Sequence, residues 1–404
     1  MVREPKFERG PNRTVALGWG AQTLEIAVPF ATTVLSPPIA PPARPWAEVC
    51  DEALAAPVGS APLAERLRGL RRVCVLVPDR TRKDVAEGLL PSILPRLARF
   101  GVDVSLGVAT GKHPHASLGG LAASAWMHDA SSPDLVRVGT TAEGTAVRFP
   151  REVLDAELRI LLGEIRPHYF AGYAGGAKLL FPGVAGAEGI WQNHRLKASP
   201  GARLGQVEGN PCRADMEAAA ALAGPSFLLN VLRGAHGGPV LAVSGDPVAA
   251  HREGVRRGAS LFECSVPEDT RFDTVVVSDT HPVTLNLYQA CKLLAPAGAL
   301  LADGGTVILA ASCAEGIGPV ETINEAIYRL GLVHSLPARH RIFLVSERSA
   351  ASVAPTFATY MPDMPTALAA AGPGRLAVLP YGGDLVPVCP RSQNFSGVSA
   401  YPDA

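Results

Sequence analysis

VCVLVPDRTRKDVAEGLLPSILPRLARFGVDVSLGVA, residues 73–109, contains the alternation from which the fold class follows. Its two ends, 73–78 and 102–109, are short apolar runs rich in valine and leucine. Such runs are typical of parallel strands that are covered on both faces. Between them, Val85 to Phe100 shows the apolar spacing of a helix. Strand, helix and strand in this order predict a parallel sheet flanked by helices.

The same alternation continues along the chain. A third apolar run lies at 158–163 (LRILLG), and a second series of runs follows it at 274–278, 306–311, 341–346 and 375–380. Helical patterns near 285–297, 319–331 and 364–371 separate the runs of this second series. The sequence therefore predicts an α/β protein with two domains, each with a mostly parallel sheet flanked by helices.

The length of 404 residues also favours two domains, because single cores usually stop growing at smaller sizes. A polar break at residues 267–269 (PED) separates the two series of strands. We therefore expect an N-terminal domain over residues 1–268 and a C-terminal domain over residues 269–404. The proline-rich residues 33–45 predict an extended connection, and Trp46 to Ala56 predicts a helix.

Composition limits the function classes. Hydrophobic residues make up 47% of the chain, and 37 basic residues balance 37 acidic ones, which is typical of a globular protein with no nucleic-acid partner. The N-terminus lacks a signal-peptide pattern, and no apolar run is long enough to span a membrane. The seven cysteines are scattered without a C-x-x-C pair, which favours a reduced, cytoplasmic location.

Polar and ionisable residues gather where the predicted strands end. Ligands of open parallel sheets bind beyond the carboxyl ends of the strands, where loops and helix N-termini converge. These positions hold Asp79, Thr81 and Arg82, then His113 and His115, then Glu164, Arg166 and His168, and in the second series Asp279, His281, Tyr288, Gln289 and Lys292. We expect an active site in the cleft between the two domains.

The segment GEIRPHYFAGYAGGAKLLFPGVAGAEGIWQNH, residues 163–194, is rich in glycine around Lys178. Gly175 and Gly176 permit a close approach of the backbone to a ligand. The segment is not a P-loop, because Leu179 follows the lysine where serine or threonine is required. It also lacks the dinucleotide fingerprint. Two readings of Lys178 remain open: covalent attachment of a carbonyl-bearing cofactor, or an ordinary anion-binding or solvated lysine.

The pattern PHYFAGYAGGAK…PGVAG…NH resembles the signature of the nickel-dependent lactate racemase family. The resemblance implies that Lys178 carries the cofactor, pyridinium-3,5-bisthiocarboxylic acid mononucleotide, and that His194 is the protein ligand to nickel. It implies that His113 and His168 are the catalytic acid/base pair. In this scheme a hydride moves from the substrate carbon to the pincer and can return to either face.

The resemblance extends over nearly the whole chain, including GTTAEGTAVR at 139–148 and GNPCRADMEAAA at 209–220. It places Asp79, Thr81, Arg82, Gly175 and Gly176 at the cofactor. It also implies that Arg82, Tyr288, Gln289 and Lys292 bind the substrate. The implied partners are a small 2-hydroxy acid and the proteins that synthesise the cofactor.

Three residues beside the expected pocket depart from the family pattern. Lys83, Pro114 and His115 stand where the family has Pro, Arg and Pro, so the substrate is expected to be lactate or a larger 2-hydroxy acid. Two alternatives remain: a nicotinamide-dependent hydroxyacid dehydrogenase, and a non-catalytic protein that binds the nickel cofactor. The missing dinucleotide fingerprint argues against the first, and the histidine pair argues against the second.

Overall fold

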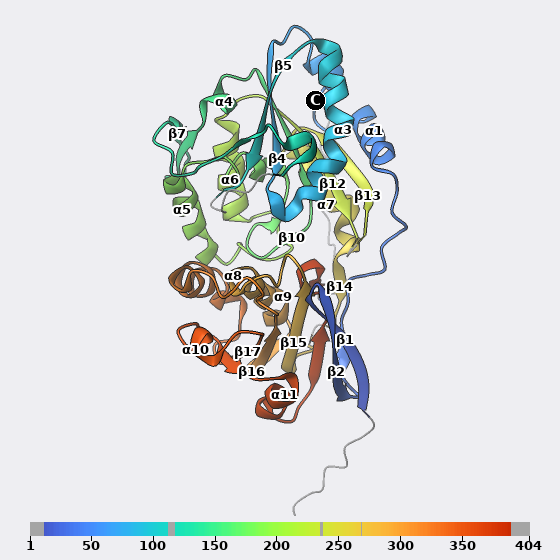
Figure 1. Ribbon diagram of the computed structural model, residues 1–404, viewed down its shortest axis with the longest axis vertical. Helices are drawn as coiled ribbons and strands as arrows, with labels where there is room; N and C mark the ends of the chain where they lie inside the picture. The colour runs from blue at the N-terminus through green and yellow to red at the C-terminus, as the bar shows by residue number, and fades with distance from the viewer. Residues whose placement is uncertain (1–11, 112–117, 235–236, 268, 389–404) are drawn as a thin grey trace, which may run out of the picture.

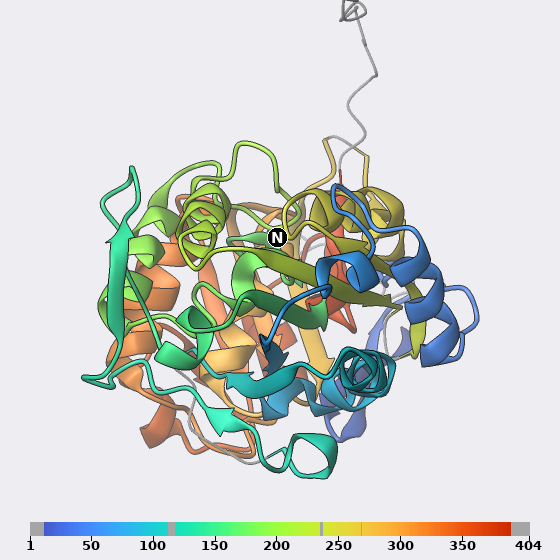
Figure 2. The same ribbon diagram turned by 90° about the horizontal axis from the view of Figure 1, so that it is seen from above.

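The computed structural model describes residues 12–111, 118–234, 237–267 and 269–388. Within these residues the strands form two main sheets, which lie one above the other in Figure 1. Viewed from above, the first sheet and its helices overlie the C-terminal part, drawn in orange and red (Figure 2). The predicted fold class, two mostly parallel sheets flanked by helices, is confirmed.

The first sheet has the strand order β13-β12-β9-β4-β5-β6 among the described residues. Only the β12–β13 pair is antiparallel in this sheet as described. The expected runs form β4, β5 and β9, whereas β12 and β13 were not predicted. The strands are β4 (Arg72–Pro78), β5 (Asp103–Ala109), β6 (Trp126–Met127), β9 (Leu158–Glu164), β12 (Ser226–Arg233) and β13 (Pro239–Gly245).

The second sheet follows the order β18-β17-β16-β15-β1-β2, with β19 pairing β15 and β3 pairing β19 in the described part of the chain. All four predicted apolar runs of the second series are strands here. The strands are β15 (Phe272–Thr280), β16 (Leu301–Ala310), β17 (Arg341–Val345), β18 (Thr359–Met361), β19 (Leu376–Leu379), β1 (Asn12–Gly20), β2 (Gln22–Pro29) and β3 (Thr33–Val34).

The N-terminal strands differ from the predicted division at residue 268, which assigned residues 12–34 to the first domain. β1 pairs with β15, and β3 pairs with β19, so this segment is part of the second sheet. Figure 1 shows β1 and β2, in blue, beside β15. The hydroxyl of Ser278 on β15 donates a hydrogen bond to the carbonyl of Gly18 on β1, which links the two strands. An alternating strand pattern does not say which sheet the strand joins, and here the partner is more than 250 residues away.

Helices cover both sheets. α1 and α3 pack against the first sheet, and α3 ends at Gly101 in the left-handed conformation. The α-helices are α1 (Trp46–Ala55), α2 (Leu63–Arg66), α3 (Lys83–Phe100), α4 (Arg151–Leu154), α5 (Ala187–Arg195), α6 (Pro211–Ala221), α7 (Ala249–Gly258), α8 (Leu287–Ala290), α9 (Leu294–Gly298), α10 (Ala350–Val353) and α11 (Met364–Ala371). Among the described residues, no helix is long and apolar enough to cross a membrane.

Shorter elements complete the chain. The 3₁₀ turns are η1 (Arg80–Arg82), η2 (Gly120–Ala122), η3 (Gly176–Leu179), η4 (Leu196–Ala198), η5 (Ala259–Leu261), η6 (Cys291–Leu293), η8 (Val333–Ser335) and η9 (Gly382–Asp384), and η7 (Thr322–Arg329) is a π-helix. Two-stranded pairs join β7 (Val136–Thr140) to β8 (Ala146–Phe149), β10 (Pro167–His168) to β11 (Gly172–Tyr173), and β14 (Glu263–Ser265) to β20 (Val386–Val388).

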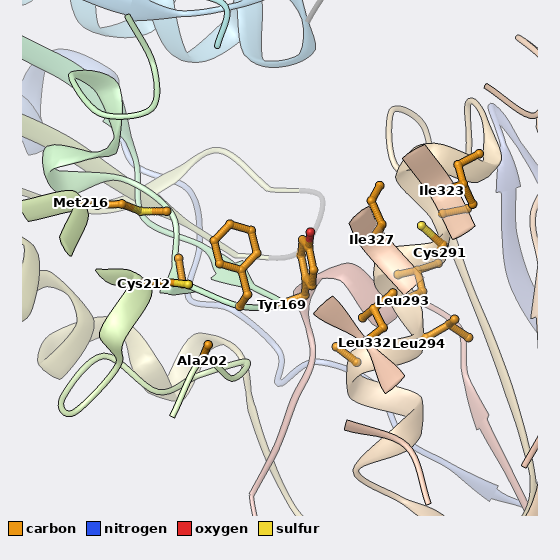
Figure 3. Packing of buried hydrophobic residues seen from close by; sticks show 14 of the residues in the cluster. Tyr169, Ala202, Cys212, Met216, Cys291, Leu293, Leu294, Ile323, Ile327 and Leu332 are labelled. Carbon is orange, nitrogen blue, oxygen red and sulfur yellow. The ribbon is translucent and has the colours of Figure 1, made fainter. Parts of the chain in front are cut away.

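One apolar core runs from the first sheet into the second. Tyr169, only 6% exposed, lies at this junction between Cys212 and Met216 on one side and Ile327 and neighbouring residues of the C-terminal part on the other (Figure 3). An ion pair also joins the two parts, with 2.6 Å between an Nη of Arg166 and Oδ1 of Asp384. The loop that carries Tyr169 is therefore held by contacts with both sheets.

The pairing of β1 predicts that a core substitution there destabilises the second sheet. Leu17 is fully buried in the cluster that β1 shares with β15 and β16. Leu17→Ala should lower the free energy of unfolding by about 2–5 kcal/mol. Ile39→Ala, at a fully exposed position, should change it by less than about 0.5 kcal/mol. Urea unfolding measures both, and equal stability of the two variants would contradict the assignment of β1 to this core.

Candidate active site

The glycine-rich segment folds into a compact turn after β9. β10 and β11 pair so that His168 lies opposite Gly172, and the chain then enters η3, which carries Lys178. Gly172 has a φ of 73°, and a Cβ atom there would lie 2.1 Å from the carbonyl oxygen of Gln206. Only glycine satisfies both conditions, so the turn depends on this residue.

The turn brings His168 and Lys178 into contact. Nζ of Lys178 lies 2.9 Å from Nε2 of His168. The ring of Phe170 lies beside both, with its centroid 5.3 Å from that Nζ and 4.6 Å from the centroid of the His168 ring. His194, on α5, contacts the same phenyl ring at a centroid distance of 5.1 Å. The expected base His168, the expected anchor Lys178 and the expected nickel ligand His194 therefore meet around one aromatic side chain.

The contacts of His168 favour one arrangement of protons for this pair. The backbone N–H of Ala171 donates to Nδ1 of His168, with 3.3 Å between the nitrogens. A neutral imidazole then carries its proton on Nε2, which faces Lys178. An ammonium group cannot accept a hydrogen bond. In this arrangement the Lys178 nitrogen accepts a hydrogen bond from the Nε2–H group and is therefore a neutral amine.

The electrostatic surroundings favour the same state. Burial, followed by the charge of Arg213, holds the pKa of Lys178 well below its usual value. Burial and the neighbouring Lys178 likewise hold the pKa of His168 well below its usual value. A neutral lysine amine is a nucleophile, whereas an ammonium group is not. Of the two readings left open by the sequence, this environment favours covalent attachment.

Cationic side chains gather around the pair. The charges of Arg82 and Lys292 act on both Lys178 and His168. Burial lowers the pKa of Lys292 to about 8. Lys197 is 4% exposed, and its Nζ lies 4.6 Å from the centroid of the Phe170 ring. This concentration of positive charge suits an anionic ligand such as a carboxylate or a phosphate.

The predicted substrate residues of the C-terminal part lie together. Asn286 caps α8 by accepting from the backbone N–H of Gln289. Nζ of Lys292 donates to Oε1 of Gln289 at 2.5 Å and lies 5.1 Å from the centroid of the Tyr288 ring. The structure thus brings Tyr288, Gln289 and Lys292 together, and their role in substrate binding stays a prediction.

The predicted turn after β4 is held by its own side chains. The Asp79 carboxylate accepts from the backbone N–H of Thr81 at 3.0 Å and from its hydroxyl at 2.6 Å. Nε of Arg82 lies 3.9 Å from Oε2 of the buried Glu164. Asp79 and Thr81 therefore shape the turn that presents Arg82.

Gly175 and Gly176 are needed for packing within the protein. Both have positive φ values, and a Cβ atom at Gly175 would lie 2.4 Å from Oδ1 of Asn230. At Gly176 the added atom would lie 3.0 Å from the ring of His251. The predicted close approach is therefore to neighbouring side chains, and a contact with the cofactor stays a prediction.

Two residues that support the turn, Arg213 on α6 and the N-cap residue Asn210, were not predicted. The fully buried Arg213 donates to the carbonyl oxygens of Ala171, Tyr173 and Gly175. Asn210 caps α6 and donates to the carbonyl of Phe170 at 2.8 Å. The Asn-Pro pair at 210–211 was an available signal for a helix start. Nothing in the local pattern indicated that Arg213 points inward.

A pocket of about 780 Å³ opens between the ends of the two sheets. Its lining includes Arg82, Glu164, Arg166 and Arg233 from the first part, and Asp279, His281 and Asp384 from the second. Burial and the charge of Asp384 raise the pKa of Asp279 to about 6. The volume lies within the range of about 300–1,000 Å³ that is usual for small-molecule sites. His113 and His115 lie outside the described residues.

Comparisons with known proteins show which family the chain resembles. A sequence model described as "Lactate racemase N-terminal domain" matches residues 17–205. The lactate racemase of Thermoanaerobacterium thermosaccharolyticum is 30% identical over 70% of this chain and 68% of its own length. The lactate racemase of Lactiplantibacillus plantarum is 30% identical over 67% of each chain.

Solved structures share the fold. The apoprotein of the T. thermosaccharolyticum lactate racemase superposes with a TM-score of 0.84 at 23% identity, covering 93% of this chain and 100% of its own. A Thermotoga maritima protein superposes with a TM-score of 0.65 at 15% identity, covering 86% and 99%. The fold and the matched sequence define an isomerase of the racemase class, as predicted. The chain belongs to the lactate racemase family.

The neutral amine of Lys178 can be observed directly. In protein labelled with ¹³C at lysine Cε, the Lys178 resonance should titrate well below the usual pKa of about 10.4, because burial and nearby cations disfavour the ammonium. The Lys292 resonance should titrate near 8. Lys178→Arg and Lys292→Arg assign the two signals. A Lys178 amine that is still protonated at pH 10 would exclude the proposed hydrogen-bond arrangement.

The buried His251 predicts a dependence of stability on pH. Its Nε2 donates to the carbonyl of Ala174, and burial lowers its pKa well below the usual value. Below about pH 6.5 the unfolded chain therefore takes up a proton that the folded chain does not, so stability falls as pH falls. Between pH 7.5 and 5.5 this costs about 1.4 kcal/mol. Urea unfolding of His251→Gln, which keeps an N–H donor, should lack this part of the loss; identical losses would refute the assignment.

Proposed function

We propose that this chain interconverts the configurations of a 2-hydroxy acid, using a nickel pincer nucleotide attached to Lys178. The observation that carries the proposal is the 2.9 Å contact between Nζ of Lys178 and Nε2 of His168, with His194 at the same phenyl ring. The named activity of the two relatives is lactate racemisation. Racemisation of lactate or of a larger 2-hydroxy acid is therefore the reaction we assign.

The residues around Phe170 fit the cofactor chemically. The Lys178 amine is suited to forming an amide-type bond, and the imidazole of His194 is a ligand type that nickel accepts. Lys197 and the other cations suit the phosphate of a nucleotide. When bound, the group supplies a centre that takes a hydride from the substrate carbon and returns it.

His168 would then move the hydroxyl proton. Its ring is held by Phe170 and by the Ala171 N–H, which directs Nε2 toward Lys178. Acylation of Lys178 would remove the amine that faces Nε2. In the tautomer with its proton on Nδ1, His168 could then accept the substrate hydroxyl proton on Nε2 and later return it from the imidazolium. His113 is the second acid/base group of the proposal, because each configuration requires a base on its own face of the carbon.

The charge distribution supports a carboxylate substrate. Arg82 lines the 780 Å³ pocket and also acts electrostatically on the Lys178 site. With Lys292 it would hold the substrate carboxylate, and the guanidinium permits a bidentate grip. The pocket wall beyond Arg82 is polar and carries Glu164, Arg233 and Asp279. His168, Lys178 and His194 are not among the residues that line this pocket, which borders their site at Arg82. A polar wall at this place would suit a substrate whose side chain is more polar than the methyl group of lactate.

The decisive experiment uses protein made in a host that synthesises the pincer nucleotide. Intact mass and metal analysis should detect an adduct with nickel, and Lys178→Arg should lose both. Wild-type protein with neither adduct nor nickel would refute the proposal, and turnover that depended on added NAD would favour a dehydrogenase instead.

Activity separates a racemase from a cofactor carrier. Single enantiomers of lactate and of larger 2-hydroxy acids, analysed by chiral chromatography, should be interconverted. His168→Asn should keep the adduct but lower kcat by about 10²–10⁴-fold, the usual contribution of a general acid or base. Arg99→Ala, at an exposed position on α3, should leave adduct and turnover unchanged. A loaded protein that interconverts none of these acids would be a carrier.

A further inference from the structure

We infer that helix α6 sets the position of the metal-binding histidine relative to the anchoring lysine, through Arg213 toward Lys178 and Asp215 toward His194. This inference rests on the proposed function. It assigns positioning roles to two buried, oppositely charged residues that stand two positions apart on one helix.

The link toward Lys178 runs through backbone carbonyls. Arg213 donates to three oxygens, those of Ala171, Tyr173 and Gly175, which span the turn between His168 and η3. The residue is fully buried, so water cannot replace these donors. The turn therefore cannot shift relative to α6 without leaving a buried guanidinium or carbonyl groups unsatisfied.

The link toward His194 runs through its neighbour in sequence. Nδ2 of Asn193 donates to Oδ2 of Asp215 at 2.8 Å and to the carbonyl oxygen of Cys212 at 3.1 Å. Asn193 is fully buried, and Asp215 is 2% exposed. Both bonds tie the last turn of α5 to the first half of α6. The backbone position of the next residue, His194, is thereby held relative to α6.

The β7–β8 hairpin completes the arrangement around Asp215. The hydroxyls of Thr141 and Thr145 both donate to this carboxylate, the second at 2.7 Å. The backbone N–H of Ala146 donates to the side chain of Gln192, also on α5, at 2.6 Å. These contacts give a physical reason for the sequence GTTAEGTAVR at residues 139–148. Its threonines donate to the buried carboxylate of Asp215, which also accepts from Asn193.

Helix α6 thus contacts the turn that carries Lys178 through Arg213, and helix α5, which carries His194, through Asp215. The usual cost of losing a group that orients a metal ligand is about 10–100-fold in metal affinity. A substitution of Asp215 should weaken nickel binding at His194 and leave the attachment at Lys178 unchanged. A substitution of Arg213 should reduce the attachment at Lys178 and leave nickel binding unchanged. A merely structural role for both would affect the two in parallel.

The test compares Asp215→Asn with Arg213→Lys in loaded protein. Asp215→Asn, which replaces an accepting oxygen by an N–H₂ group, should keep the lysine adduct and raise the nickel dissociation rate at least tenfold. Arg213→Lys, which cannot reach three carbonyls at once, should lower the fraction of chains with the adduct, while the nickel content per adduct stays unchanged. Equal losses of adduct and nickel in both variants would overturn the inference.

Two controls separate positioning from stability. Thr141→Val and Thr145→Val each remove one hairpin donor but leave the Asn193 contact, so they should lower stability in urea without accelerating nickel loss. Faster nickel loss in these variants, in proportion to their instability, would overturn the inference.

The apoprotein supplies a readout that does not depend on the cofactor. In ¹⁵N-histidine spectra, Asp215→Asn should shift the His194 ring signals and leave those of His168 in place. Arg213→Lys should shift His168 instead. This pattern survives even if wild-type protein never acquires the adduct, whereas unshifted His194 signals in Asp215→Asn would reject the inference while leaving the proposed function standing.

Discussion

The turn between His168 and Lys178 depends on one buried cation. Three of its carbonyl oxygens face the interior, and each would cost free energy if it were left without a donor. The guanidinium of Arg213 donates to all three, and the oxygens of Ala171 and Gly175 also accept from the backbone N–H groups of Tyr173 and Lys178. Burial of this charge lowers its own pKa to about 10 and contributes to the depressed pKa of Lys178. The same residue therefore shapes the loop and favours the neutral amine.

The site lies where the two sheets meet, and its residues come from both. Tyr169 joins the two parts by apolar packing, and Arg166 joins them by an ion pair with Asp384. Between these contacts, Arg82 from the first sheet and Lys292 from the second impose positive charge on the same histidine. Neither part alone would give His168 this environment. The protonation of His168 therefore depends on residues of both parts of the chain.

The sequence predicted the elements whose signal is local. The valine-rich strands β4 and β15, the helix α3 and the glycine-rich turn all lie where their patterns placed them. The pairing of β1 and the inward direction of Arg213 were not predictable, because both depend on partners distant in sequence. A charged residue in a helix is usually exposed, and only tertiary contacts reverse this. The resemblance implied roles for Lys178, His168 and His194, which stay predictions, but it did not indicate that all three lie beside Phe170.

The pairing of β1 with β15 has a consequence for synthesis on the ribosome. The ribosome makes β1 and β2 before β15, and the strand beside β1 follows it by some 260 residues. The first sheet, between residues 72 and 245, can assemble in the meantime from neighbouring segments. Until β15 emerges, the leading hairpin has an open edge and an uncovered apolar face. During translation this hairpin therefore exposes an edge and an apolar face that other chains could contact, until β15 and β16 cover them.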